Sequence, residues 1–288
     1  MKIREFLKLV RFEHALMLAV AVFIGESVAG GKIPEINNIL WISLLIPIFS
    51  EMGSFALNDY LDIETDHINK KMTPLVRATI NPQFAFYFAW ASFIVSLVLA
   101  FYINETAITI VGLFNIFAVL YNYKLKDIPL VGNVYISLTM GIPFIFGAVV
   151  VSPIIPISIW LLALIGCISG LGREIVKSTE DVEGDIRARR AQTLPILIGR
   201  KNALIFAILL YLLFIPLAYL PFNYGLKPSV SSQVLINGAI IGVLYNVLLL
   251  YKSYNEEDKT MKEYLKKARK ISLISLGIGL LAYLVGVL

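Results

Sequence analysis

Residues 39–66 read ILWISLLIPIFSEMGSFALNDYLDIETD, an apolar run that ends in a cluster of acids. The apolar part, residues 39–57, contains one ionisable side chain, Glu51, and is long enough to cross a ~30 Å hydrocarbon layer as a helix. A carboxylate at the end of such a run is costly unless positive charge neutralises it. The stretch therefore predicts a membrane-spanning helix with a functional end.

Apolar runs of this kind recur along the chain, each about 17–22 residues long, which suits helical spans. The 288-residue chain is 58% hydrophobic and 16% charged, with a mean hydropathy of +0.78, as soluble domains rarely are. Helices satisfy their backbone groups within the segment, and the alternating polarity of barrel strands is absent. We therefore predict an all-α polytopic membrane protein with about nine helices in one bundle. The expected spans are residues 14–30, 39–57, 83–103, 106–122, 130–151, 156–172, 202–222, 231–251 and 270–288.

The acid cluster after residue 57 has helical spacing. If the helix continues, Asp59, Asp62 and Asp66 are spaced i, i+3, i+7 and share one face. Asn58 lies one turn before Asp62. Three like charges on one face repel each other, so the pattern predicts a cation between them. The alternative is a solvated helix end, although the helix dipole disfavours acids at a C-terminus.

A second acid cluster follows the sixth span. Its members are spaced i, i+3, i+7, i+11, as one stripe of a helix that continues from the span: Glu174, Lys177, Asp181 and Asp185. Lys177 can pair with these acids or meet a phosphate. A ladder of salt bridges on an exposed helix would explain Lys177 beside Asp181. It would not explain why both clusters contain the spacing D-x3-D.

Carboxylates from two helix ends suit a divalent cation. Mg²⁺ prefers hard oxygen ligands and is commonly bound by a few carboxylates together with substrate phosphates. The candidate metal ligands and catalytic residues are Asp59, Asp62, Asp66, Asp181 and Asp185. The two clusters together predict magnesium-dependent chemistry on a diphosphate at a membrane surface.

The basic residues predict the orientation of the helices. Of the 25 Lys and Arg residues, all but Lys32 and Lys227 fall in segments that the nine spans place on one side. That side, with the N-terminus and both acid clusters, is expected to be cytoplasmic in a multi-pass protein of the cell membrane. The net charge of +5 is mostly this bias and gives no evidence for a nucleic-acid partner. The sequence leaves the oligomeric state open.

The motif Asn58-Asp-x-x-Asp-x-x-x-Asp66, together with Asp181-x-x-x-Asp185, resembles the paired aspartate motifs of the UbiA superfamily of intramembrane prenyltransferases. The resemblance covers the whole chain. It implies a single transmembrane prenyltransferase domain over residues 1–288, with helices around a central cavity and a cytoplasmic active face. Residues 173–195 are most similar to one archaeal branch, the digeranylgeranylglyceryl phosphate synthases, which make ether lipids.

The resemblance also implies a reaction and its site. A prenyl diphosphate would be held by Mg²⁺ between the two acid clusters, and the allylic group would pass to an acceptor. In the archaeal branch the donor is geranylgeranyl diphosphate. The acceptor is the free hydroxyl of geranylgeranylglyceryl phosphate, a lipid phosphate, and the product is its diether. The substrate-binding residues implied are Asn58, Arg11, Tyr121, Lys124, Lys126, Arg173, Glu174 and Lys177.

The sequence departs from the family pattern in two places. The first motif is often followed by N-x-P-x-R-P, whereas here Asn69 leads through KKMTPLV to Arg77. Near the N-terminus, His14 stands where an Asn is usual. Glu51 lies two turns before Asn58 on the same face. It is either the group that takes the acceptor proton or a neutral, hydrogen-bonded polar residue.

The acceptor is open from the residues alone. An acceptor phosphate beside a diphosphate needs extra positive charge, which the following loop offers in Arg187, Arg189, Arg190, Arg200 and Lys201. The positive-inside bias would place some of these residues there for any acceptor. Prenylation of an aromatic or quinone precursor is the alternative within the superfamily.

Two other classes of membrane protein are less consistent with the chain. CDP-alcohol phosphotransferases need D-x-x-D-G-x-x-A-R, but Ile63 follows Asp62. A cation-coupled transporter would use the acids as an ion path. Transport sites usually lie near the bilayer midplane between broken helices, whereas these acids all lie at one edge.

Overall fold

The computed structural model describes residues 2–189 and 192–288, and over this part of the chain it contains helices, turns and loops but no strand. The helices are α1 (Ile3–Leu9), α2 (Phe12–Gly30), α3 (Asn38–Leu61), α4 (Ile63–Ile68), α5 (Pro82–Ala100), α6 (Glu105–Tyr123), α7 (Val131–Val151), α8 (Ile157–Gly184), α9 (Leu194–Ile198), α10 (Arg200–Leu217), α11 (Leu220–Asn223), α12 (Val230–Tyr254) and α13 (Asp258–Val287). A 3₁₀ turn, η1 (Leu125–Asp127), follows α6, and a π-helical turn, η2 (Asp185–Arg189), follows α8.

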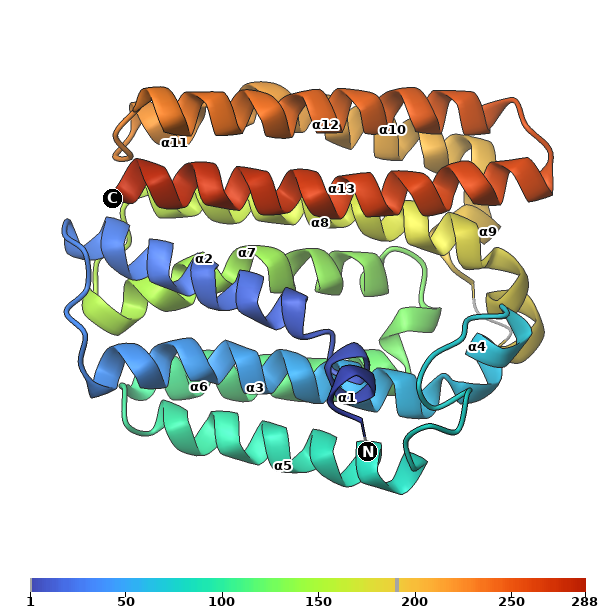
Figure 1. Ribbon diagram of the computed structural model, residues 1–288, viewed down its shortest axis with the longest axis horizontal. Coiled ribbons are helices and arrows are strands. Elements are labelled where there is room, and N and C mark those ends of the chain that lie inside the picture. Colours follow the sequence, from blue (N-terminus) through green and yellow to red (C-terminus); the bar gives the residue numbers. More distant parts are fainter. Residues whose placement is uncertain (1, 190–191) are drawn as a thin grey trace.

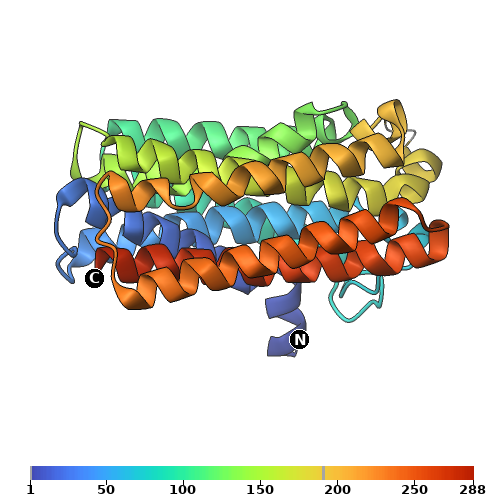
Figure 2. The same ribbon diagram turned by 90° about the horizontal axis from the view of Figure 1, so that it is seen from above.

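The long helices run along the long axis of one bundle (Figure 1). Helix α12 packs along α13, α3 along α5, and α7 along both α2 and α8. The short helices α4 and α9 lie together at one end of the bundle, while α1 projects from its side (Figure 2). Nine helical segments of the described chain are long and apolar enough to cross a membrane, which confirms the all-α architecture and the nine expected spans.

Glycines let the central helices approach each other closely. A Cβ on Gly25 of α2 would lie 2.3 Å from the carbonyl oxygen of Phe144 in α7. A Cβ on Gly147 of α7 would lie 2.1 Å from the carbonyl oxygen of Val22 in α2. Small residues at such crossings permit the backbone contact that drives helix association in lipid. The α2–α7 contact therefore depends on these two positions.

Two helices are longer than their expected spans. Helix α8 continues past its apolar span to Gly184, as the spacing of the second acid cluster predicted, whereas α13 begins at Asp258 rather than near residue 270. Their polar extensions lie side by side: Arg269 Nη1 is 2.8 Å from Glu180 Oε2, and Lys262 Nζ is 2.8 Å from Glu183 Oε2. A span predicted from hydropathy stops at the first charged residues. These two helices continue beyond that point because the charged side chains of α8 pair with those of α13.

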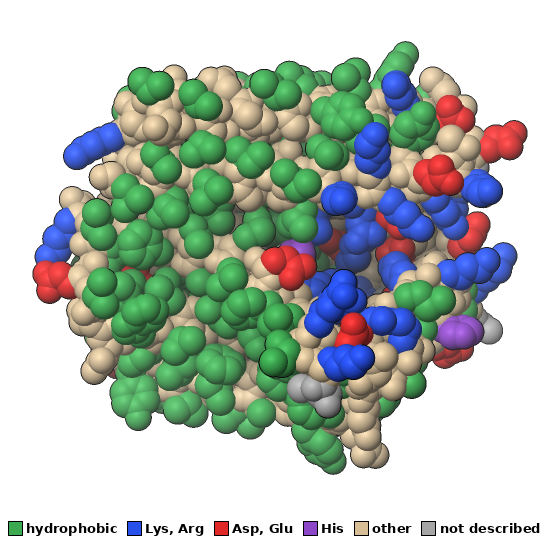
Figure 3. All heavy atoms as spheres, in the orientation of Figure 1, with side chains coloured by type: hydrophobic (Ala, Val, Ile, Leu, Met, Phe, Trp, Pro, Cys, Tyr) green, Lys and Arg blue, Asp and Glu red, His purple; other side chains and the backbone are tan. Residues whose placement is uncertain are grey.

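The surface separates into two regions. Figure 3 shows hydrophobic side chains over most of the visible face of the bundle. Lys, Arg, Asp and Glu gather around a hollow near the end that carries α4 and α9 (Figure 3). Exposed aromatic side chains such as Trp41 and Trp160, each more than half exposed, suit contact with lipid. The polar hollow is therefore the place to look for chemistry.

Candidate active site

Two adjoining cavities open at the polar end of the bundle. The first, which we call the acid cavity, has a volume of about 280 Å³ and carries most of the acid-cluster residues. The second, which we call the central cavity, has a volume of about 370 Å³ and extends between α2, α3, α7, α8 and α13. The cavities share lining residues, so they are continuous: Arg11, Asn58, Tyr121, Glu174, Lys177 and Arg269.

The first acid cluster is divided by a break between α3 and α4. Asp62 lies at this junction, accepting the N–H of Asp66 at 2.7 Å, and both side chains line the acid cavity. Asp59 is buried and is not among the residues that line the acid cavity, so its role as a metal ligand stays a prediction. It contacts Arg11, with Arg11 Nη2 3.1 Å from Asp59 Oδ1. The charge of Asp59 still acts on that of Asp66, so the two carboxylates remain close to each other.

The second acid cluster has the predicted geometry. Helix α8 and the π-helical turn after it carry the stripe without a break, and all four of its side chains line the acid cavity: Glu174, Lys177, Asp181 and Asp185. Lys177 Nζ lies 2.6 Å from Glu174 Oε1, so in this state the lysine pairs with the glutamate. Asp181 and Asp185 are both buried and face the cavity beside the first cluster.

Two lysines neutralise the facing carboxylates. Lys71 Nζ lies 2.7 Å from Asp181 Oδ2 and 3.8 Å from Asp66 Oδ1, so one ammonium group connects the two clusters. Lys126 Nζ donates to Asp62 Oδ1 at 2.5 Å. Burial raises the pKa of Asp66 to about 6, against the opposing effect of the Lys71 charge. A cation beside this carboxylate therefore favours its ionised form.

The donor set of the acid cavity suits Mg²⁺. Within residues 2–189 and 192–288, no three acidic, histidine or cysteine side chains already form a metal site. The Lys71 ammonium nevertheless occupies a position between carboxylates of both clusters, where a divalent cation can bind the same oxygens. The residues that would hold the metal, once the lysines turn away, are Asp62, Asp66, Asp181 and Asp185.

Of the remaining predicted residues, some line the cavities and others do not. Asn58 Nδ2 donates to Asp62 Oδ2 at 2.9 Å, and Tyr121 is buried where the two cavities meet. Lys124 is exposed and lines neither cavity, because the 3₁₀ turn after α6 directs Lys126 inward instead. Arg77 pairs with Glu5 of α1 and lines neither cavity.

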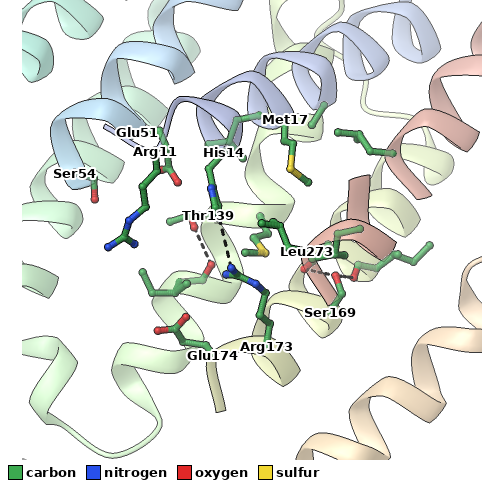
Figure 4. A pocket seen from close by; sticks show the side chains of 18 of the residues that line it. Arg11, His14, Met17, Glu51, Ser54, Thr139, Ser169, Arg173, Glu174 and Leu273 are labelled. Carbon is green, nitrogen blue, oxygen red and sulfur yellow. Dashed lines mark hydrogen bonds between the residues drawn. The ribbon is translucent and has the colours of Figure 1, made fainter. Parts of the chain in front are cut away.

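The central cavity has an apolar body and a charged mouth. Its apolar lining comes mainly from α7, α8 and α13 and includes Leu162, Ile165, Leu273, Leu276, Leu280 and Tyr283. Figure 4 shows Arg11, His14 and Glu51 on one side of the cavity and Arg173 opposite them. Arg173 Nη2 lies 3.5 Å from His14 Nε2. Such a cavity fits a long hydrocarbon chain that carries an anionic end.

Sequence reasoning missed Lys71 and Arg269 as site residues. Arg269 lies on the charged start of α13, which resembles a surface segment because four lysines surround it in sequence. Lys262 and Arg269 are spaced i, i+7, which places them on one face of a helix. That spacing could have indicated a shared role, because both side chains contact acids of α8. Arg187 is exposed and lines neither cavity, and the side chains of Arg189 and Arg190 lie outside the described part of the chain.

Comparisons with known proteins show which family the chain is similar to. A profile of the UbiA prenyltransferase family matches residues 18–283. The digeranylgeranylglyceryl phosphate synthase of Archaeoglobus fulgidus is 34% identical over 96% of this chain and 93% of its own length. A solved structure from work on the biosynthesis of digeranylgeranylglyceryl phosphate synthase in membranes is 30% identical, with a TM-score of 0.70 over 99% of this chain and 98% of its own.

A second solved structure supports the fold. The structure of a UbiA homolog from Archaeoglobus fulgidus bound to GPP and Mg²⁺ has a TM-score of 0.66 and is 20% identical. It covers 97% of this chain and 99% of its own. The family match over nearly the whole chain, the nine spans and the facing acid clusters lead to one conclusion: the chain belongs to the UbiA prenyltransferase family.

Proposed function

We propose that the protein transfers a geranylgeranyl group from geranylgeranyl diphosphate to the free hydroxyl of geranylgeranylglyceryl phosphate, in a magnesium-dependent reaction. The product is the diether of archaeal membrane lipids. The observation that carries the proposal is similarity over nearly the full length to several proteins named digeranylgeranylglyceryl phosphate synthase. The two continuous cavities support it, because one suits a metal-bound diphosphate and the other a long apolar chain.

The acid cavity would bind the diphosphate of the donor. Asp62, Asp66, Asp181 and Asp185 would hold Mg²⁺, which when bound neutralises the diphosphate and makes it a better leaving group. Lys71 and Lys126 would then exchange their carboxylate partners for diphosphate oxygens, because ammonium groups form strong charge-assisted hydrogen bonds to phosphate. Asn58 would keep Asp62 oriented through the hydrogen bond between their side chains.

The transfer itself exchanges one C–O bond for another. The bond between the allylic carbon and the diphosphate breaks, and its electron pair leaves with the diphosphate. The hydroxyl oxygen of the acceptor forms the new ether bond and loses its proton. Glu51 lines the central cavity and is a candidate to accept this proton. Its alternative role as a neutral polar residue predicts that Glu51→Gln keeps its activity.

We also propose that residues 1–288 form one domain of the cell membrane, with the N-terminus and both cavities on the cytoplasmic side. The support is the distribution of Lys and Arg, which gather at the end of the bundle with the acid cavity (Figure 3). A cytoplasmic site gives direct access to water-soluble diphosphate and to magnesium.

The test is product identification with purified protein in detergent. The protein is incubated with geranylgeranyl diphosphate, Mg²⁺ and equal concentrations of geranylgeranylglyceryl phosphate and 4-hydroxybenzoate, and the products are identified by mass. We expect the diether phosphate and an equal amount of released diphosphate. Preferential prenylation of the aromatic ring would replace the lipid acceptor with an aromatic one. No release of diphosphate with either acceptor would overturn the proposed reaction and favour the transporter alternative.

A further inference from the structure

Arg173 differs from the other cations at the cavity mouth because no carboxylate of the described chain lies within ion-pair distance of its guanidinium, although the charges of Glu174 and Glu51 act on it from farther away. In the part of the chain that the structure describes, no carboxylate forms an ion pair with its guanidinium, and its Nε is buried without a hydrogen-bond partner. Its one polar side-chain contact is His14 Nε2, at 3.5 Å. The neighbouring cations are each paired with an acid: Arg11 with Asp59, Lys177 with Glu174, and Arg269 with Glu180.

An unpaired guanidinium in this position is costly to the folded protein. Burial of a cation carries a desolvation penalty, and the charges of Glu174 and Glu51 offset it without a hydrogen bond to the guanidinium. Such a group usually contacts an anion during function. Arg173 points into the central cavity toward His14 (Figure 4). Arg269 lines the same cavity, and its Nε is also buried without a partner. The two guanidiniums thus have buried donors that no group of the described chain accepts, although Arg269 also pairs with Glu180 through its Nη1.

Arg173 is separate from the candidate site for the donor diphosphate. Arg173 and His14 line the central cavity but not the acid cavity. Lys71 and Lys126 line the acid cavity but not the central cavity. Arg269 lines both and marks the boundary. One anion could therefore bind beside Lys71 and Lys126 in the acid cavity, and a second beside Arg173 in the central cavity.

We propose that Arg173, assisted by Arg269, binds the phosphate monoester of the acceptor lipid. The proposal rests on the proposed function, which supplies an acceptor with a phosphate, a nearby hydroxyl and one apolar chain. A guanidinium suits this role because it donates two parallel hydrogen bonds to phosphate. The hydroxyl is on the carbon next to the phosphate ester carbon, so a phosphate held at the cavity boundary places the hydroxyl beside the donor. The apolar body of the central cavity accommodates the chain.

The first test measures acceptor binding without catalysis. Arg173→Met replaces the guanidinium with an apolar side chain, and Arg4→Met makes the same change at an exposed position that lines neither cavity. Binding of geranylgeranylglyceryl phosphate and of geranylgeranylglycerol is measured in detergent without donor or Mg²⁺. We expect wild-type protein and Arg4→Met to prefer the phosphate. Arg173→Met should lose roughly 10- to 100-fold in affinity for the phosphate, as for loss of hydrogen bonds to a charged group.

The second test separates the two substrates kinetically. In Arg173→Met, KM for the acceptor phosphate should rise by a similar factor, while KM for the donor diphosphate stays within about twofold of wild type. An equal rise in KM for the donor would place Arg173 in the donor site and overturn the proposal. An unchanged preference for the phosphorylated acceptor would also overturn it.

Two further results keep the test decisive. If Arg173→Met does not fold, Arg173→Lys retains the charge but loses the planar pair of donors, and should show a smaller loss of phosphate affinity with unchanged donor affinity. Wild-type affinity in Arg173→Lys would contradict a guanidinium-specific site. A further outcome is that wild-type protein binds the acceptor phosphate more tightly than Arg173→Met does and yet forms no product. That result would contradict the proposed reaction and would support the phosphate site at Arg173.

Discussion

At the scale of single residues, the carboxylates of the acid cavity carry the strongest prediction. Asp62→Asn and Asp181→Asn should each reduce turnover by roughly 100-fold or more, because an amide cannot neutralise a metal that stabilises developing charge. The measurement is the initial rate at saturating substrate over a range of Mg²⁺ concentrations.

A matched control is Glu183→Gln on the same helix. Glu183 pairs with Lys262 and lines neither cavity, so its removal should leave turnover within about twofold of wild type. Near-normal turnover of either aspartate variant would rule out a metal site built from both clusters.

Lys71 gives a second prediction, on stability. Its ammonium group connects Asp66 and Asp181, so Lys71→Met leaves two facing clusters of carboxylates without their shared cation. The thermal midpoint of Lys71→Met should fall in the absence of divalent ions, and Mg²⁺ should raise it more than it raises the midpoint of wild-type protein. Thermal unfolding with and without Mg²⁺ measures both values.

The neighbouring Lys70→Met is the control for Lys71→Met, because Lys70 is exposed and lines neither cavity. It should respond to Mg²⁺ as wild-type protein does. If Mg²⁺ stabilised Lys71→Met no more than this control, Lys71 would not occupy the position of the metal.

The residues that could be predicted from the sequence are those fixed by local geometry. The stripe from Glu174 to Asp185 follows from helical periodicity alone, and it is in place. The ion pair of Asp59 could not be predicted in this way, because its partner Arg11 is far away in sequence. Lys71, in the loop after α4, and Arg269 were missed for the same reason: each has an acidic partner on α8 more than 80 positions away.

At the scale of elements, hydropathy located the spans but not the polar ends of the helices; the spacing of the acids predicted the end of α8, and nothing predicted the start of α13. Apolar residues are needed only where a helix meets lipid or core, so the expected sixth span ended near residue 172 and the ninth began near residue 270. The active-site ends of α8 and α13 extend beyond those limits. They are stable there because they pack against each other through the ion pair of Glu180 and Arg269.

The crossing of α2 and α7 gives a prediction at this scale. Gly147→Ala would place a Cβ 2.1 Å from the carbonyl oxygen of Val22, which no side-chain rotation can relieve. Separation of the two helices should lower the free energy of unfolding by about 1–3 kcal/mol or more, as overpacking does in well-packed cores. Thermal unfolding of the purified variant measures the loss.

Gly277→Ala in α13 is the control for Gly147→Ala, because a Cβ at Gly277 meets no atom within 4 Å. It should be neutral or stabilising by up to about 1 kcal/mol, since alanine favours helix. Equal stability of the two variants would show that α2 and α7 are farther apart at Gly147 than in the structure.

At the scale of the whole molecule, composition was sufficient for the architecture. Nine apolar segments, with nearly all Lys and Arg in the connections on one side of them, predict a polytopic helical bundle. The structure has that bundle. The order in which the helices pack could not be predicted from hydropathy, because every span is apolar on most of its surface. That order brings the ends of α3 and α8 together, and it is what turns two acid motifs into one cavity.

The orientation of the bundle gives the last prediction. Cys167 is the single cysteine, so Cys167→Ala provides a background for cysteines introduced one at a time. Lys32→Cys and Lys227→Cys lie at the end of the bundle away from the acid cavity, whereas Lys70→Cys and Lys201→Cys lie at its active end. In intact cells, a membrane-impermeant maleimide should label the first pair and leave the second unlabelled until the membrane is opened. Labelling of Lys70→Cys in intact cells would reverse the orientation and place the diphosphate site outside, where the cytoplasmic supply of prenyl diphosphate could not reach it.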